Sequence, residues 1–82
     1  MKINLYHGDL PEDIKWGDSV AIDTETMGLD PKRDKLCLVQ ISTGNDICHL
    51  VKIDLTNKKP LNLIKLLKNS KIQKIFHFAR FD

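Results

Sequence analysis

Two carboxylates, Asp23 and Glu25, are the residues whose types and spacing are best suited to chemistry. They follow directly on the short apolar run at residues 19–22. Side chains two positions apart in a strand project to the same face, so both carboxylates can point at one spot. Two such groups repel each other unless a divalent cation lies between them. The pattern predicts a metal site or, in the plainer interpretation, two surface acids at a strand end.

A third carboxylate, Asp82, follows a second apolar run at residues 74–78. The residues between that run and Asp82 resemble the start of a helix, so a strand again leads into a helix beside an acid. In an open α/β sheet, the carboxyl ends of neighbouring strands converge on one crevice. If the strand at 74–78 lies beside the strand at 19–22, all three carboxylates meet. Oxygen ligands of this kind suit Mg²⁺ or Mn²⁺ and phosphate substrates.

The rest of the chain must position these acids. The alternation of polar and apolar residues predicts strands at residues 2–6 (an edge strand), 19–22, 36–41, 47–53 and 74–78. Short connections predict a three-stranded antiparallel meander from 19 to 53, with Gly44 in its second loop. The last strand is expected to pair in parallel with the strand at 19–22. The predicted fold class is therefore α/β.

Two helical segments are predicted between these strands. Pro60 fits the first turn of a helix whose apolar stripe is expected to contain Leu63, Ile64 and Leu67. A single helical turn is expected at residues 11–14, with Asp9 as its cap.

Both acidic segments resemble the motifs of a known enzyme family. The run Ala21-Ile22-Asp23-Thr24-Glu25-Thr26-Met27-Gly28-Leu29 resembles the first motif of the DEDD 3′–5′ exonucleases. Residues 74–82 resemble the start of their second motif. Residues 38–42, and a His five positions before Asp82, are similar to the ribonuclease D branch. The resemblance covers nearly the whole chain in the right order.

This resemblance implies a truncated ribonuclease H-like exonuclease fold that hydrolyses terminal phosphodiesters with two metal ions, Mg²⁺ or Mn²⁺. The implied substrate is the 3′ end of a nucleic acid, RNA rather than DNA. The resemblance assigns catalysis and metal binding to Asp23, Glu25 and Asp82. It assigns contacts with the terminal nucleotide to Thr26, Met27 and Leu29; the plainer interpretation of Met27 and Leu29 is that they anchor a loop.

The family's third motif, a Tyr or His followed by a fourth Asp, has no counterpart in the sequence. Residues 1–82 are therefore expected to be the N-terminal portion of an exonuclease domain, with an incomplete two-ion site. A complementing chain or a homo-oligomer is a candidate source of the missing groups. A non-catalytic remnant that binds metal or nucleic acid is the alternative function. An unrelated small α/β interaction domain is a third interpretation.

Composition excludes several classes of protein. The 82 residues have room for one domain, and 41% hydrophobic with 29% charged residues is typical of a soluble globular chain. The longest apolar run, residues 36–39, is far shorter than the roughly 20 residues that span a bilayer, so no membrane association is expected. Cys37 and Cys48 do not form a disulfide framework, and with His49 and His77 they lack zinc-ligand spacing. A cytoplasmic location is expected.

Charge is unevenly distributed along the chain. Residues 1–54 contain ten acids and six bases, whereas residues 55–81 contain seven bases and no acid. A one-signed stretch indicates an anionic partner or, more plainly, a solvated basic face. We expect its lysines at positions 65, 68, 71 and 74 to be exposed and unpaired with acids.

Overall fold

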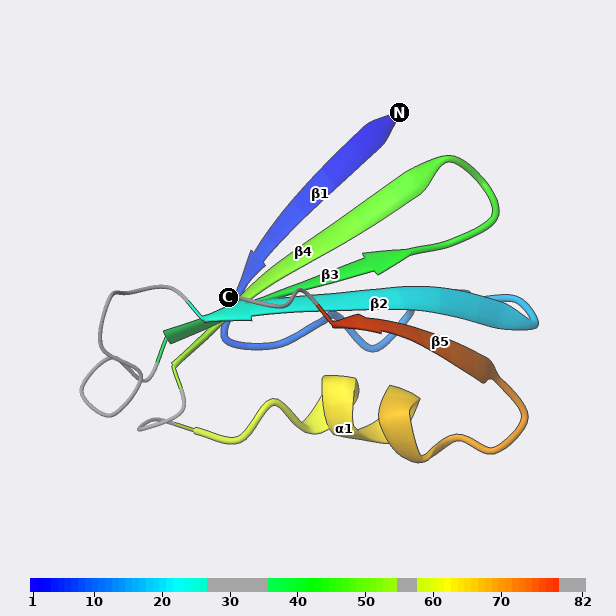
Figure 1. The fold of residues 1–82 in the computed structure, drawn as a ribbon. Helices are drawn as coiled ribbons and strands as arrows, with labels where there is room; N and C mark the ends of the chain where they lie inside the picture. The colour runs from blue at the N-terminus through cyan, green and yellow to red at the C-terminus, as the bar shows by residue number, and fades with distance from the viewer. Residues whose placement is uncertain (27–35, 55–57, 79–82) are drawn as a thin grey trace.

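The computed structural model describes residues 1–26, 36–54 and 58–78. Five strands and one helix lie within these ranges, and Figure 1 shows how they are arranged. In chain order they are β1 (Lys2–His7), β2 (Ser19–Thr26), β3 (Leu36–Ser42), β4 (Ile47–Asp54), α1 (Leu61–Lys68) and β5 (Gln73–Phe78). The predicted α/β class is confirmed.

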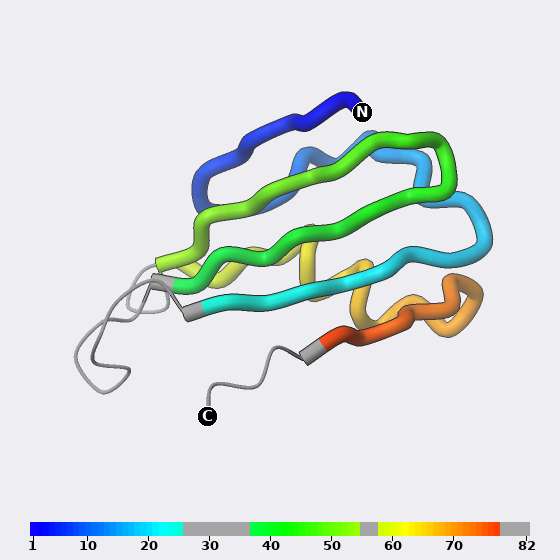
Figure 2. The backbone as a smooth tube through the Cα atoms, turned by 45° about the horizontal axis from the view of Figure 1, so that its top comes forward, coloured from blue at the N-terminus to red at the C-terminus, as the bar shows by residue number. Residues whose placement is uncertain are grey.

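The strands form one sheet in the order β1-β4-β3-β2-β5, which can be followed in Figure 2. Strands β2, β3 and β4 pair antiparallel, which confirms the meander, and β5 pairs parallel to β2 as predicted. Strand β1 is an edge strand, as predicted, and pairs parallel to β4. Because only β3 runs the opposite way, β1, β2, β4 and β5 all end at one side of the sheet, which we call the carboxyl edge.

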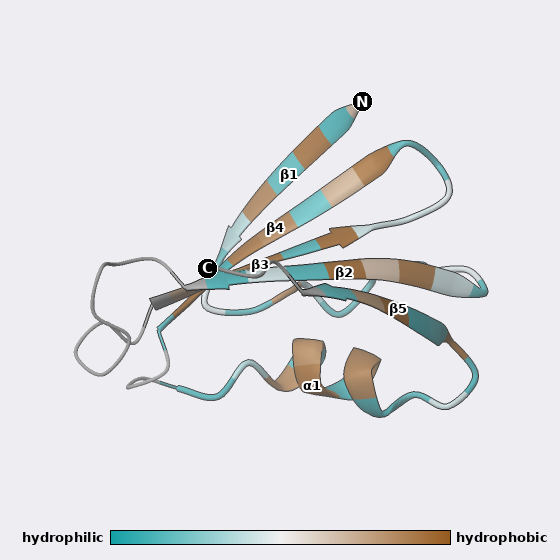
Figure 3. Cartoon of the chain, in the orientation of Figure 1, coloured by the Kyte–Doolittle hydropathy of each residue, from teal (hydrophilic) through white to brown (hydrophobic). Residues whose placement is uncertain are grey.

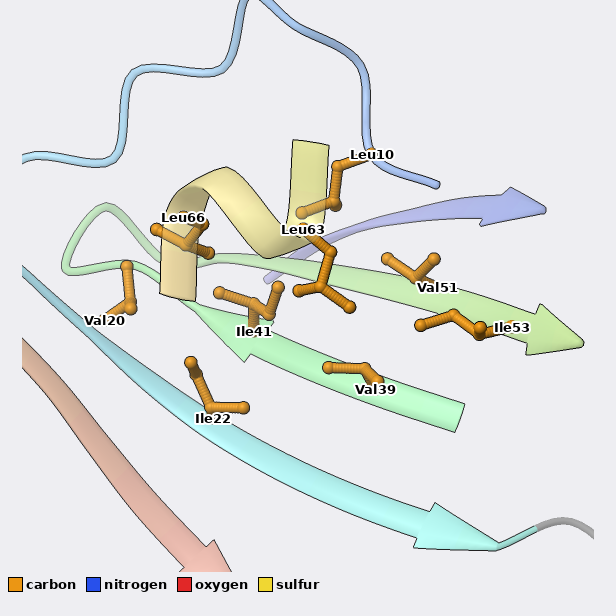
Figure 4. Close-up of a cluster of buried hydrophobic side chains, with 9 residues drawn as sticks. All are labelled: Leu10, Val20, Ile22, Val39, Ile41, Val51, Ile53, Leu63 and Leu66. Carbon is orange, nitrogen blue, oxygen red and sulfur yellow. The ribbon is translucent and has the colours of Figure 1, made fainter. Parts of the chain in front are cut away.

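Helix α1 and the segment after β1 cover one face of the sheet. Figure 4 shows Leu63 and Leu66 of α1, with Leu10, against valine and isoleucine side chains of β2, β3 and β4. The predicted stripe is wrong at Leu67, which is 41% exposed; Leu66 takes the buried place. Leu63 and Leu66 are three positions apart and so lie on the same side of the helix.

Asp9 caps α1, and not the turn predicted at residues 11–14, where the structure has no helix. Its carboxylate accepts hydrogen bonds from the backbone N–H groups of Asn62 (2.9 Å) and Leu63 (3.0 Å), and from that of Leu10 (2.8 Å). The Asn62 side-chain amide donates to the Leu10 carbonyl at 2.7 Å. These bonds satisfy helix N–H groups that have no partner within the helix, and they fix the start of α1 beside β1.

His49 is a buried polar residue on the same face, 6% exposed. Its ring stacks on Tyr6 at a centroid distance of 5.8 Å and meets the edge of Trp16 at 5.1 Å. The Tyr6 hydroxyl lies 3.1 Å from Nδ1 of His49. Burial lowers the pKa of His49, because the charged imidazolium loses water that these rings do not replace.

The hairpin between β3 and β4 turns through residues 43–46. Asp46, and not Gly44, takes the left-handed backbone conformation, with φ of 59°. Aspartate tolerates that conformation better than most residues do. Its carboxylate also lies 3.3 Å from the N-terminal amino group, which ties the start of β1 to this hairpin.

Two further findings concern membrane-spanning helices and disulfide bonds. In the described ranges, no helix has the length and apolar character needed to cross a membrane. Cys37 and Cys48 are both free. Cys37 packs against the core beneath α1, whereas Cys48 alternates with His49 along β4 and so lies on the other face of the sheet.

Candidate metal-binding active site

Strand β2 carries Asp23 and Glu25 on the face of the sheet opposite α1, which we call the open face. Val20 and Ile22 are 2% exposed and pack toward α1. Side chains alternate along a strand, so Ala21, Asp23 and Glu25 project to the open face. The prediction that both acids share one face of a strand end therefore agrees with the structure. Asp23 is half-buried and Glu25 is exposed.

Two polar residues flank Asp23 across the strands. Gln40 of β3 and His77 of β5 are its direct partners in the strand register, and both are exposed on the open face. Neighbouring strands lie about 4.8 Å apart, so these side chains stand next to the carboxylate. Neither residue was predicted to lie beside Asp23. The sequence shows that each of them alternates with apolar residues along its strand. Which residue lies opposite Asp23, however, depends on how the strands pair in the sheet.

Among the described residues, one oxygen of Asp23 has no hydrogen-bond partner. Oδ1 is buried, and the described residues offer it no donor. A buried anionic oxygen without a partner is costly, because the water it lost has not been replaced. A bound cation removes that cost, and carboxylate oxygens are the ligands that Mg²⁺ and Mn²⁺ prefer. The donor set around Asp23 therefore fits a hard divalent cation.

Asp23 and Glu25 supply only part of a complete metal site. Within the described ranges, no three His, Cys, Asp or Glu side chains cluster closely enough to hold an ion. Asp82, the third predicted ligand, lies outside the described residues, as do Met27 and Leu29. Strand β5 nevertheless runs parallel to β2, and both end at the carboxyl edge. The prediction that the three carboxylates meet required these two strands to lie side by side, and they do.

Thr26 is the last residue of β2, directly after Glu25. Its backbone still pairs with Cys37 of β3, so the strand continues past both acids. The two carboxylates are therefore held by sheet hydrogen bonds on a rigid element, which is what a ligand pair needs if its geometry is to be fixed.

The basic stretch is mostly exposed. Lys65, Lys68 and Lys71 are exposed, as predicted, but Lys74 is half-buried and its ammonium group contacts the Asn69 carbonyl. Within residues 1–26, 36–54 and 58–78, none of these four lysines forms an ion pair with an acid, as expected. The exposure of Lys74 was predicted wrongly, because its side chain lies over the turn that leads into β5.

A cavity of about 750 Å³ opens at the carboxyl edge, on the side of β1 and β4. Four lysines and three acids line it, so its charges nearly balance. Asp9, one of the acids, is already engaged in capping α1. The charges that line the cavity therefore favour neither an anionic nor a cationic ligand. Its cationic lining residues are Lys52, Lys58, Lys59 and Lys65, with His7.

Comparisons with family models and with solved structures both relate this chain to known proteins. A family model described as a 3′–5′ exonuclease matches residues 8–82. Among solved structures, NrnC of Brucella melitensis with bound Mg²⁺ is 52% identical; the match covers 100% of this chain and 41% of that one, with a TM-score of 0.79. The same protein bound to pGG gives 52% identity, the same coverage and a TM-score of 0.78.

A further structure, the apo form of a nuclease, is 38% identical over 94% of this chain and 38% of its own, with a TM-score of 0.78. The search of curated proteins finds no match. The 82 residues thus span about two fifths of the length of NrnC.

Proposed function

The chain belongs to the 3′–5′ exonuclease family, whose model it matches over residues 8–82, and from this premise we propose that it carries the metal-binding acids of an enzyme that removes nucleotides from RNA 3′ ends. The observation that carries the proposal is the buried Oδ1 of Asp23, which finds no hydrogen-bond partner in the described part of the chain and lies on the same face as Glu25. The identity of 52% to NrnC with bound Mg²⁺, over all 82 residues, supports it.

In this proposal Asp23, Glu25 and Asp82 hold two divalent ions, Mg²⁺ or Mn²⁺. When bound, such ions lower the pKa of water and neutralise charge on the leaving oxygen. Strand β2 fixes Asp23 and Glu25 at neighbouring same-face positions, and strand β5, which precedes Asp82 in the sequence, pairs parallel to β2 and ends at the same edge. Gln40 and His77 lie on either side of Asp23, where they can donate hydrogen bonds to a phosphate or to the carboxylate.

Recognition of the terminal nucleotide is proposed for Thr26, Met27 and Leu29. Thr26 directly follows Glu25 at the end of β2, so its backbone lies next to the proposed metal ligand. The NrnC complex with pGG supports a short nucleic acid as the substrate class. RNA is preferred to DNA because of the similarity to the ribonuclease D branch.

The 82 residues are proposed to be the N-terminal portion of the exonuclease domain. The match to 41% of NrnC supports this, since most of that chain has no counterpart in the 82 residues. We place the activity in the cytoplasm, because the two cysteines are free and lie on opposite faces of the sheet. A reducing compartment is where unpaired thiols persist.

A chimera tests the proposal. The matched 41% of Brucella melitensis NrnC is replaced by these 82 residues, and release of mononucleotide from pGG is followed with Mg²⁺ or Mn²⁺. We expect hydrolysis that Asp23→Asn reduces at least 100-fold and that Asp18→Asn, at an exposed acid just before β2, leaves unchanged. A folded chimera that binds pGG and Mn²⁺ but does not cleave would favour the non-catalytic alternative.

A further inference from the structure

Three lysines form an exposed surface on the α1 side of the sheet. Lys65, Lys68 and Lys71 are exposed, and in the part of the chain that the structure describes none of them pairs with an acid. Lys65 and Lys68 are three positions apart on α1 and so lie on one side of the helix. The opposite side carries Leu63 and Leu66, which pack against the sheet. Lys71 follows in the turn before β5, and we call these three residues the lysine surface.

Helix stability explains only part of this charge. The C-terminal end of a helix carries partial negative charge, so Lys65 and Lys68, in the last turn of α1, are favourable there. Lys71 lies beyond that turn. The exposed Lys59 stands directly before Pro60, the N-cap of α1, where a positive charge is unfavourable. Figure 3 shows hydrophilic residues immediately before and after the helix. Bases at both ends of α1 therefore indicate an anionic partner.

The excess of positive charge lies outside the cavity at the carboxyl edge. Lys65 lines that cavity, where acids nearly offset the lysines. Lys68 and Lys71 are not among its lining residues. They lie toward the end of α1 and beyond it, in a stretch, residues 58–73, that contains five lysines and no acid. An anion is therefore attracted to α1 and the turn after it rather than to the cavity.

The composition of this stretch favours a phosphate backbone over a protein as the partner. The centre of a protein–protein interface is depleted in lysine and enriched in aromatic residues, whereas nucleic-acid interfaces are strongly positive. Residues 58–73 contain no aromatic residue on which a base could stack. Binding would therefore use phosphates alone, which carry no sequence information. Lysine suits such contacts, because its ammonium group binds phosphate as a point charge.

We propose that the lysine surface binds the phosphate backbone of single-stranded RNA, on the side of the sheet opposite Asp23 and Glu25 and without a metal ion. The choice of RNA rests on the proposed function. The surface itself goes beyond that function, because none of its residues belongs to the proposed metal site. Each lysine that neutralises a phosphate releases a condensed cation, so the affinity falls as salt rises.

Fluorescence anisotropy with a 5′-labelled RNA of about 20 nucleotides, recorded in EDTA between about 50 and 200 mM salt, tests the proposal. Three phosphate contacts to a single strand contribute about −2 to the slope of log affinity against log salt, at about −0.7 each. The triple variant Lys65→Gln, Lys68→Gln and Lys71→Gln is expected to lose this contribution and to bind at least tenfold more weakly at low salt. Glutamine has nearly the helix propensity of lysine, and circular dichroism establishes that the fold is retained.

A second triple variant, Lys2→Gln, Lys15→Gln and Lys52→Gln, is the matched control. It removes the same charge at exposed lysines that precede α1. We expect this control, and Asp23→Asn, to keep the affinity and the slope of the wild type. An equal loss in the control would overturn the proposal, because net charge and not the lysine surface would then determine binding.

Two further results would also overturn the proposal. One is the absence of RNA binding by the wild type at low salt. The other is binding of polyglutamate at least as tight as that of RNA of the same charge, which would assign the lysine surface to an acidic protein. Hydrolysis of pGG by the chimera tests the proposed activity separately, since binding in EDTA involves no metal-dependent step.

Discussion

Replacing Asp23 by Asn should stabilise the metal-free protein, although it removes the proposed metal ligand. Oδ1 of Asp23 is buried and finds no donor among the described residues. An unsatisfied buried polar atom costs about 1–3 kcal/mol, and a charged one costs more. Asp23 is only half-buried, and asparagine retains an amide oxygen that still needs a donor. We therefore expect the free energy of unfolding to rise by about 1 kcal/mol.

Urea and thermal unfolding in EDTA measure this gain. For a domain of this size, about 1 kcal/mol corresponds to a rise in Tm of about 4–8 °C. Mn²⁺ should then reverse the order of stability: at a concentration 100 times its Kd it adds about 2.7 kcal/mol to the wild type and little to the variant. Asp18→Asn, an exposed acid next to β2, is the matched control and should change neither value.

Two results would refute this reasoning. Loss of more than 1 kcal/mol in EDTA would mean that the Asp23 carboxylate already has favourable partners. Equal stabilisation of wild type and Asp23→Asn by Mn²⁺ would place the bound ion elsewhere.

Three further predictions concern the cap, the buried histidine and the isolated chain. Asp9→Ala should lower the free energy of unfolding by about 2 kcal/mol, since two helix N–H groups lose their acceptor, whereas Asp13→Ala should change it little in urea titrations. Because burial lowers the pKa of His49, the stability that its neutral form contributes is complete above the unfolded pKa of about 6.5 and is lost as the pH falls toward the folded pKa. His49→Phe should therefore make the free energy of unfolding in urea less dependent on pH between 7.5 and 5; an unchanged pH dependence would contradict this. The 82-residue chain alone should bind Mn²⁺ weakly and trim 3′-labelled RNA at least 1,000-fold more slowly than a complete member of the exonuclease family, a loss of about 4 kcal/mol of transition-state stabilisation; trimming at a comparable rate that Asp23→Ala abolishes would contradict this.

Local patterns were sufficient to predict most of the sheet. Alternation and apolar runs located all five strands, and the short connections predicted the meander. The parallel pairing of β5 with β2 followed from the change of period around α1. By contrast, nothing within residues 2–6 specifies β4 as the partner of β1, because any strand with an unpaired edge offers the same hydrogen-bonding groups.

The sequence predicted the relative positions of site residues only where those residues are close together along the chain. Asp23 and Glu25 are two residues apart, and a strand is enough to place them on one face. Gln40 and His77 reach Asp23 through the register of two different strand pairs, and a shift by one residue would turn either of them to the other face. The cap of α1 by Asp9 likewise joins residues more than 50 positions apart.

The most direct test of the central claim, that Asp23 and Glu25 form a divalent-metal site on the open face, is Mn²⁺ titration by isothermal calorimetry. We expect saturable binding to the wild type that Asp23→Asn and Glu25→Gln each weaken at least tenfold and that Asp18→Asn leaves unchanged. Binding of equal affinity in all four proteins, or no saturable binding to the wild type, would contradict the claim.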